Sequence, residues 1–170
     1  MTDNSADPTY LDSEGSSEST EPGKQYRIVV GVDDSACARN ALSWACEEAR
    51  LRGAELRIVH AWSYPSWATG YFVSPVEIDQ AEEWAKESLD SVLADSREQL
   101  IGLSAESILV EGPAAKVLID ESKDADLLVV GSRGRGGFSG LLLGSVSQYV
   151  AHHCSCPVVI VRNIPDHQHV

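Results

Sequence analysis

Short runs of β-branched and apolar residues recur along the chain and alternate with segments of helical periodicity. The first run, from Tyr26 to Val32, has the continuous apolar character of a strand that is buried on both faces. The further runs that predict strands lie at 55–62, 108–110, 126–130 and 157–162. The pattern therefore predicts five strands separated by longer connections.

Apolar residues that repeat every three or four positions fill the intervals between these strands. Asp34 or Ser35 can cap the first helix, and Gly53 ends it. Pro75 begins a long helix whose apolar face continues as far as Leu100. The other two helical segments follow Gly112-Pro113 and span Gly144–His153. Residues 63–74 form a loop that contains proline and aromatic residues.

Strict alternation of strands and helices predicts crossover connections, hence a parallel sheet with helices on both faces. A chain of 170 residues, 43% of them hydrophobic, suits one domain with a core of its own. In such sheets ligands bind beyond the carboxyl ends of the strands. The expected places are those that follow Val32, Ala61 and Val130.

Acidic residues are concentrated at the start of the chain. Residues 1–24 contribute −5 to a net charge of −13 and contain few bulky apolar groups, so we expect a disordered acidic tail. The folded domain then covers 25–163, and 164–170 form a C-terminal tail. The charge argues against a nucleic-acid partner, so an anionic ligand needs a local cradle.

The cysteines and the apolar runs bear on metal binding and location. Cys37 and Cys46 lie in the first helix, and Cys154 and Cys156 lie two apart beside His152 and His153, which is not a zinc-site spacing. We interpret them as thiols, with no metal site.

No signal peptide and no stretch of about 18 apolar residues is visible in the sequence. We therefore expect a cytoplasmic protein without a membrane partner.

Glycine is unusually dense after the fourth strand, where six of the fourteen residues from Gly131 to Gly144 are glycine. Glycine allows a backbone to approach a ligand closely. The helix that starts at Gly144-Ser145 offers unpaired amides and a positive dipole end to a phosphate, and the hydroxyls of Ser145 and Ser147 can add donors. A surface loop with a polar helix cap remains the alternative interpretation.

Several other nucleotide and hydrolase motifs are absent from the sequence. No GxxxxGK[ST] loop is present, no GxGxxG follows the first strand, and no GxSxG surrounds Ser139. The HxGH and SGGxDS signatures of other adenine-nucleotide enzymes are also missing.

The glycine spacing Gly131-x2-Gly134-x9-Gly144-Ser145 resembles the G-2x-G-9x-G(S/T) motif of ATP-binding universal stress proteins. The similarity extends over nearly all of 25–163, including 28–35, 41–45, 111–114, 128–134 and 156–161. It implies a Rossmann-like fold with strand order 3-2-1-4-5. It also implies ATP, with Mg²⁺, as the ligand.

The resemblance assigns parts of the ligand to positions in this chain. It implies that Gly31, Val32 and Asp33 lie against the adenosine and that the strand end around His60 and Ala61 passes the adenine edge. Gly131 and Arg133 would neighbour the ribose and phosphate. The residues implied to surround the phosphates are Gly134, Gly144, Ser145, Val146 and Ser147.

Some positions near this site carry more than one interpretation. Asp34 stands where glycine is common in the family, which can tighten the turn or repel phosphates. Asp33 can instead be a helix N-terminal acid, and His60 is interpreted as a strand-edge polar residue and not a base. The aromatic residues that could cover the adenine, or simply pack the loop, are Trp62, Trp67, Tyr71 and Phe72.

The expected function is ATP binding in stress response or signalling, with weak or no hydrolysis, because the glycine loop holds no base. The alternatives are a nucleotide-free interaction protein of the same fold and a weak ATPase. Val158–Val161 is expected to be an apolar edge strand, which predicts a homodimer through that strand.

Overall fold

Five parallel strands form one sheet in the order β3-β2-β1-β4-β5, in a computed structural model that describes residues 25–63, 75–135 and 142–162. The strands are β1 (Arg27–Gly31), β2 (Glu55–Trp62), β3 (Ser104–Glu111), β4 (Leu127–Gly131) and β5 (Val158–Val161). The predicted fold class and strand order are therefore confirmed. The order places β1 and β4 side by side at the centre and leaves β5 at an edge.

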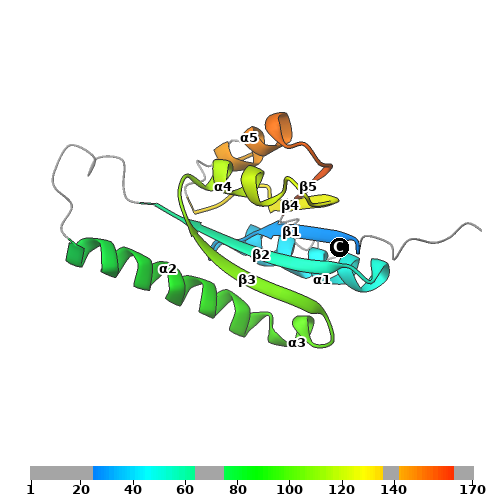
Figure 1. Cartoon of the computed structure of the whole chain (residues 1–170), viewed down its shortest axis with the longest axis horizontal. Helices are drawn as coiled ribbons and strands as arrows, with labels where there is room; N and C mark the ends of the chain where they lie inside the picture. Colours follow the sequence, from blue (N-terminus) through cyan, green and yellow to red (C-terminus); the bar gives the residue numbers. More distant parts are fainter. Residues whose placement is uncertain (1–24, 64–74, 136–141, 163–170) are drawn as a thin grey trace, which may run out of the picture.

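Helices cover both faces of the sheet (Figure 1). They are α1 (Ala36–Arg52), α2 (Pro75–Asp95), α3 (Arg97–Leu100), α4 (Ala114–Glu121) and α5 (Ser145–His153). In Figure 1, α1, α2 and α3 lie on one side of the sheet, and α4 and α5 lie on the other. The molecule is thus a three-layer α/β structure.

Alternate side chains of the central strands fill two separate cores, as the period of a strand requires. Ile28 and Val30 of β1 pack with α1 and α2 on one face. Val29 of the same strand packs with Val117 and Val150 of α4 and α5 on the other. Both faces of β1 and β4 are buried, which explains their uninterrupted apolar sequences.

Both ends of α1 follow from local sequence. Ser35 is the N-cap, and its hydroxyl accepts a hydrogen bond from the amide of Ala38 at 3.2 Å. Gly53 ends the helix with φ of 59°, a left-handed conformation that glycine adopts without strain. The helix start lies just beyond β1 and so helps to shape the sheet end where ligands bind.

Two expectations from the sequence were wrong in extent. The third strand begins at Ser104 and not at 108, and its first four residues are exposed, so no apolar run marks them. The long helix expected from Pro75 to Leu100 is broken at Ser96, whose φ and ψ of −101° and 8° separate α2 from α3. Val92, the buried Ser96 and Leu100 are spaced four residues apart, so the spacing of one helix face continues across the break and conceals it.

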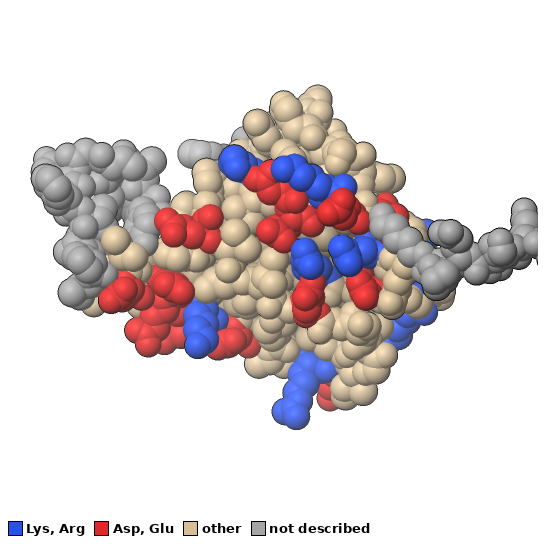
Figure 2. All heavy atoms as spheres, viewed as in Figure 1, with Lys and Arg blue, Asp and Glu red and all other residues tan. Residues whose placement is uncertain are grey.

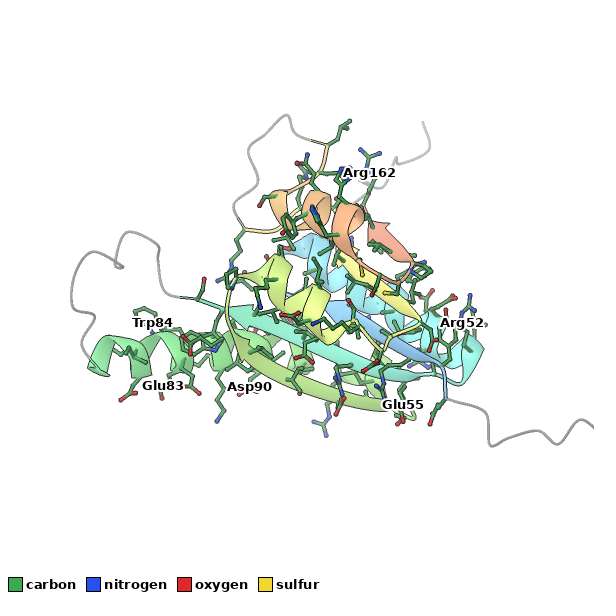
Figure 3. All side chains as sticks on the ribbon, turned by 45° about the horizontal axis from the view of Figure 1, so that its top comes forward. Arg52, Glu55, Glu83, Trp84, Asp90 and Arg162 are labelled. Carbon is green, nitrogen blue, oxygen red and sulfur yellow. The ribbon has the colours of Figure 1, made fainter. Side chains whose placement is uncertain are left out.

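Charged side chains lie along α2 and at both ends of the sheet. Figure 2 shows acidic side chains gathered over α2, where Glu82, Glu83, Glu87 and Asp90 are exposed. Figure 3 labels Glu55 at the other end of the molecule, at the start of β2, where Arg27 lies 3.2 Å from its carboxylate. The ion pair formed with Glu55 therefore lies at the amino end of the sheet.

Some sequence expectations concern segments outside the described residues. These are the acidic tail 1–24, the C-terminal tail 164–170, most of the loop 63–74, and residues 136–141 of the glycine-rich segment. Among the residues that are described, no helix is both long and apolar enough to span a membrane.

Candidate functional site

A cleft of about 450 Å³ opens at the carboxyl ends of β1, β2 and β4, within the usual size range of small-molecule sites. Three segments that are far apart in the sequence meet there: the end of β1, the end of β2 and the stretch from β4 into α5. The cleft brings together all eleven residues singled out from the sequence: Gly31, Val32, Asp33, Ala61, Gly131, Arg133, Gly134, Gly144, Ser145, Val146 and Ser147.

The N-terminal turn of α5 forms one side of the cleft. Gly144 is the N-cap in an extended conformation, and its amide donates to the carbonyl of Ser132 at 2.7 Å. This bond ties the start of the helix to the residue that follows β4. The cleft therefore faces a helix N-terminus, whose first amides have no partner within the helix and carry partial positive charge.

Two serines in the first turn of α5 play different structural roles. Ser145 is exposed, whereas Ser147 is only 3% exposed and its hydroxyl donates to the carbonyl of Gly131 at 2.7 Å. The sequence had offered both hydroxyls as additional donors to a phosphate. The Ser147 proton is instead used inside the protein, so this serine anchors α5 to β4.

Close packing, against backbone at one position and against a side chain at the other, explains two of the glycines in the cleft. A Cβ at Gly131 would lie 2.8 Å from the backbone carbonyl carbon of Cys37 in α1, a contact that no side-chain motion can relieve. A Cβ at Gly134 would lie 2.6 Å from Oδ2 of Asp33. Both glycines let the segment after β4 lie directly against the start of α1.

Acidic residues after β1 hold the segment after β4 in place. Oδ1 of Asp33 accepts from the amide of Ser35 at 3.0 Å, and Oδ2 accepts from the amide of Arg135 at 3.2 Å. The Arg135 side chain forms an ion pair with Asp34, with Nε and Oδ1 3.1 Å apart. The Ser35 hydroxyl donates to the carbonyl of Arg133 at 3.4 Å. Asp33 thus acts both as a helix-start acid and as a bridge between two segments.

An apolar part of the cleft was not identified from the sequence. Val59 of β2 and Leu118 of α4 line it together with Ala61. Gly31 keeps this region open, because a Cβ there would lie 2.7 Å from a methyl group of Leu118. The remaining lining residues that were not expected at the site are Ala38, Ala114, Val130 and Leu143, whereas Arg135 was expected nearby as a source of positive charge. A signal existed for Ala114, because it begins the helix after Gly112-Pro113.

His60 does not lie where the sequence analysis placed it. It is only 1% exposed, so the interpretation as a strand-edge polar residue was wrong. Neighbouring residues Val59 and Ala61 line the cleft, while His60 points to the other face of β2 and does not line it. Burial, reinforced by the charge of Arg135, lowers the pKa of His60 below 6.5. Of the four aromatic residues considered as a cover, only Trp62 is described, at the end of β2.

The described residues offer little to a metal ion. No three His, Cys, Asp or Glu side chains within 25–63, 75–135 and 142–162 are placed to share one. The cleft nevertheless combines helix amides, two arginines and an apolar region, which suits a ligand with an anionic part and an apolar part.

Comparisons with known proteins agree with this geometry. The model of the universal stress protein family matches residues 26–162. A universal stress protein of Mycolicibacterium smegmatis is 36% identical over 143 residues, which cover 81% of this chain and 48% of that protein. The chain spans about half the length of the curated relatives it matches.

Two solved structures of similar proteins contain adenine nucleotides. A universal stress protein from Archaeoglobus fulgidus in complex with dAMP is 27% identical with a TM-score of 0.58, over 80% of this chain and 97% of that one. A universal stress protein in complex with cAMP is 27% identical with a TM-score of 0.60, over 80% and 96% of the two chains.

Proposed function

The chain belongs to the universal stress protein family, and from this premise we propose that it binds ATP in the cleft and acts in stress response or signalling. The observation that carries the proposal is the convergence of all eleven candidate residues on one cleft beside a helix N-terminus. The related structures with dAMP and cAMP support an adenine nucleotide as the ligand.

The phosphates would lie against the first turn of α5. Backbone amides from Ser145 onward face the cleft, and an anion there gains from both the amides and the helix dipole. Arg133 and Arg135 are exposed at the same place and supply positive charge in an otherwise acidic chain. The glycines at 131 and 134 leave the backbone accessible, which supports the fit of a phosphate chain.

The adenosine would lie in the part of the cleft between β1, β2 and α4. Gly31, Val32 and Ala61 present backbone and small side chains, and Val59 and Leu118 give apolar contact. Asp33 also lines the cleft, and both of its carboxylate oxygens accept hydrogen bonds from backbone amides of the protein. A planar apolar base and a hydroxyl-bearing sugar match these surfaces.

We propose binding with weak or no hydrolysis. A γ-phosphate hydrolase needs a positioned base or an oriented water. Both carboxylate oxygens of Asp33 already accept backbone amides, Asp34 is paired with Arg135, and His60 is on the other face of the sheet. Mg²⁺ would accompany the ATP, bound mainly by the phosphates, as this ion usually is when few carboxylates are available.

Mass spectrometry of nucleotide released from freshly purified, denatured protein tests the proposal, followed by calorimetry with ATP, AMP and cAMP. We expect ATP to be retained or to bind with measurable heat. Ligand at about 100 times its Kd should stabilise the fold by about 2.7 kcal/mol. Absence of both heat and thermal shift would favour a nucleotide-free interaction protein. Phosphate release near 1 s⁻¹, a rate typical of slow enzymes, would favour an ATPase.

We further propose that two copies pair through β5. This strand is at the edge of the sheet, and Val158–Val161 are all partly exposed. An apolar edge strand is a favourable surface for pairing with its symmetry mate. Light scattering at micromolar concentration should give the mass of a dimer, and Val159→Lys should convert it to a monomer. A monomeric mass for the unchanged chain would contradict the proposal.

A further inference from the structure

Two thiols face each other at the connection between α5 and β5. Cys154 is the C-cap of α5, and Cys156 follows it after one residue. Their sulfur atoms are 3.4 Å apart. Both residues are partly exposed, whereas Cys37 and Cys46 are buried in α1. The chain therefore contains one close and accessible dithiol together with two buried thiols.

A disulfide can form here without large motion. A disulfide bond is about 2.05 Å long, so the two sulfur atoms need to approach by about 1.3 Å from their present separation. The connection is bent at Ser155 and Cys156, which shortens the distance that an extended backbone would impose. Rotation of the two side chains can supply the rest.

The surroundings make the two thiols unequal. The hydroxyl of Ser122, which is fully buried at the end of α4, lies 3.3 Å from the sulfur of Cys154 and also donates to the carbonyl of Ile119 at 3.2 Å. A hydroxyl can rotate, so Ser122 can accept from a Cys154 thiol or donate to its thiolate. If the hydroxyl turns from the carbonyl of Ile119 to the sulfur, its single hydrogen is donated to the thiolate and stabilises the anionic form of Cys154.

The pKa values follow the same asymmetry. Burial raises the pKa of Cys154, but hydrogen bonds from Ser122, from Cys156 and from the backbone of Ser155 outweigh it and lower the pKa below 9.0. Burial raises the pKa of Cys156 to about 11, and the bond to Cys154 and its charge add to the effect. Cys154 is thus the thiol that ionises first.

We propose that Cys154 and Cys156 are a redox-sensitive modification site, at which a low-molecular-weight disulfide oxidises them to a reversible intramolecular disulfide with Cys154 as the attacking thiol. The proposal rests on the close sulfur atoms, their partial exposure and the Ser122 contact. It is independent of nucleotide binding, because the site lies at the opposite end of α5 from the cleft.

The reaction consists of two exchange steps. The Cys154 thiolate attacks one sulfur of the small-molecule disulfide, which breaks the S–S bond and releases one small thiolate. Cys156 then loses its proton to solvent and attacks the Cys154 sulfur, which expels the second small thiolate. The two cysteines lose two electrons and two protons, and the small disulfide gains the electrons and becomes two thiols.

Such a disulfide would be easily reduced. It closes a very small ring, so little chain entropy is removed from the unfolded state and strain opposes closure. Strained and exposed disulfides have the more oxidising potentials that are found in labile and regulatory pairs. The site therefore suits switching between two states and not permanent reinforcement of the fold.

The test uses the full-length reduced protein incubated with oxidised glutathione and analysed by intact mass and peptide mapping. We expect a species that has lost two hydrogens, with the new bond in the peptide that holds Cys154 and Cys156. Dithiothreitol should reverse it. Mixed disulfides at Cys37 or Cys46, a bond between two chains, or unchanged thiols throughout would overturn the proposal.

Two single variants identify the attacking thiol. C156S should accumulate a mixed disulfide with glutathione at Cys154, whereas C154S should react more slowly at Cys156. Burial raises the pKa of Cys156, so a smaller fraction of its thiol is ionised at neutral pH. Equal rates for the two variants would overturn the assignment, and circular dichroism of each variant verifies its fold.

Ser122 is assigned as a positioning residue. Removal of its hydroxyl in Ser122→Ala should raise the pKa of Cys154. The rate at which Cys154 attacks oxidised glutathione should therefore increase with pH at a higher pH in the C156S/S122A protein than in C156S. Ser122→Thr, which keeps a hydroxyl, should restore the profile. An unchanged pH profile in Ser122→Ala would show that Ser122 does not act on the thiolate.

Discussion

Removal of the Ser147 hydroxyl is the sharpest test of how α5 is fixed to the sheet. The hydroxyl donates to the Gly131 carbonyl at 2.7 Å from a side chain that is 3% exposed. Loss of a buried partner costs about 1–3 kcal/mol, and the better helix propensity of alanine returns about 0.5 kcal/mol. We therefore expect Ser147→Ala to lower the free energy of unfolding by about 0.5–2.5 kcal/mol.

Ser145→Ala is the matched control, two residues earlier in the same turn. Ser145 is exposed, so its replacement should change the free energy of unfolding by no more than about 0.5 kcal/mol. If the phosphates lie at this helix start, the loss of an exposed donor should instead weaken ATP binding by about fivefold, equivalent to about 1 kcal/mol. The two serines should thus separate stability from ligand binding.

Urea unfolding without nucleotide, followed by circular dichroism, measures the first quantity, and calorimetry with ATP measures the second. In thermal unfolding, Ser147→Ala should lower Tm by about 1–10 °C for a chain of this size. The reasoning is refuted if Ser147→Ala is as stable as the unchanged protein, or if Ser145→Ala is the more destabilised of the pair.

Four further substitutions test other parts of the structure. Gly131→Ala should cost about 1–3 kcal/mol because its Cβ meets the α1 backbone, whereas Gly144→Ala, with its nearest atom at 3.5 Å, should cost less; urea unfolding should rank them in this order. His60→Leu should remove the contribution of His60 to the pH dependence of the free energy of unfolding. Burial lowers the pKa of His60 below 6.5 in the folded state, so the unfolded state binds the proton more tightly. Stability is therefore lost as pH falls below 6.5, by at most about 1.4 kcal/mol per pH unit. An unchanged slope in His60→Leu between pH 7.5 and 5.5 would contradict this. Asp34→Asn should strengthen ATP binding by about two- to fivefold at low salt, because it releases Arg135 and removes an acid beside the phosphates; calorimetry that shows no change would argue against phosphates at this position.

The sequence predicted those parts of the fold that depend on repeated burial. β1 and β4 are buried on both faces, so every residue in them is apolar or small except Arg27, and their runs are unmistakable. β3 begins with four exposed residues at an edge of the sheet, where burial leaves no pattern to detect. The break at Ser96 was hidden because Val92, Ser96 and Leu100 keep the four-residue spacing of a helix face, although Ser96 is polar.

The site was predictable where it depends on backbone and not where it depends on tertiary side-chain partners. Glycine density identified the segment after β4, because only small residues allow such close packing, and the rule that ligands bind beyond strand ends identified the ends of β1 and β2. The individual residues at those two ends came from the resemblance to universal stress proteins. The sequence cannot show that Ser147 donates to Gly131, or that His60 lies on the far face of β2. Both facts depend on which helices and strands pack together in the folded chain. The hydrogen bonds and the burial of a side chain are set by those tertiary neighbours.

The carboxylate of Asp33 joins two parts of the chain that are about a hundred residues apart, at Ser35 and Arg135. The cleft consequently cannot assemble until β1 and β4 have paired, which is the pairing at the centre of the sheet. Contacts of such long sequence separation form late and slowly during folding. Recovery of the cleft during refolding should therefore report completion of the whole domain, and no fragment that lacks either strand should contain it.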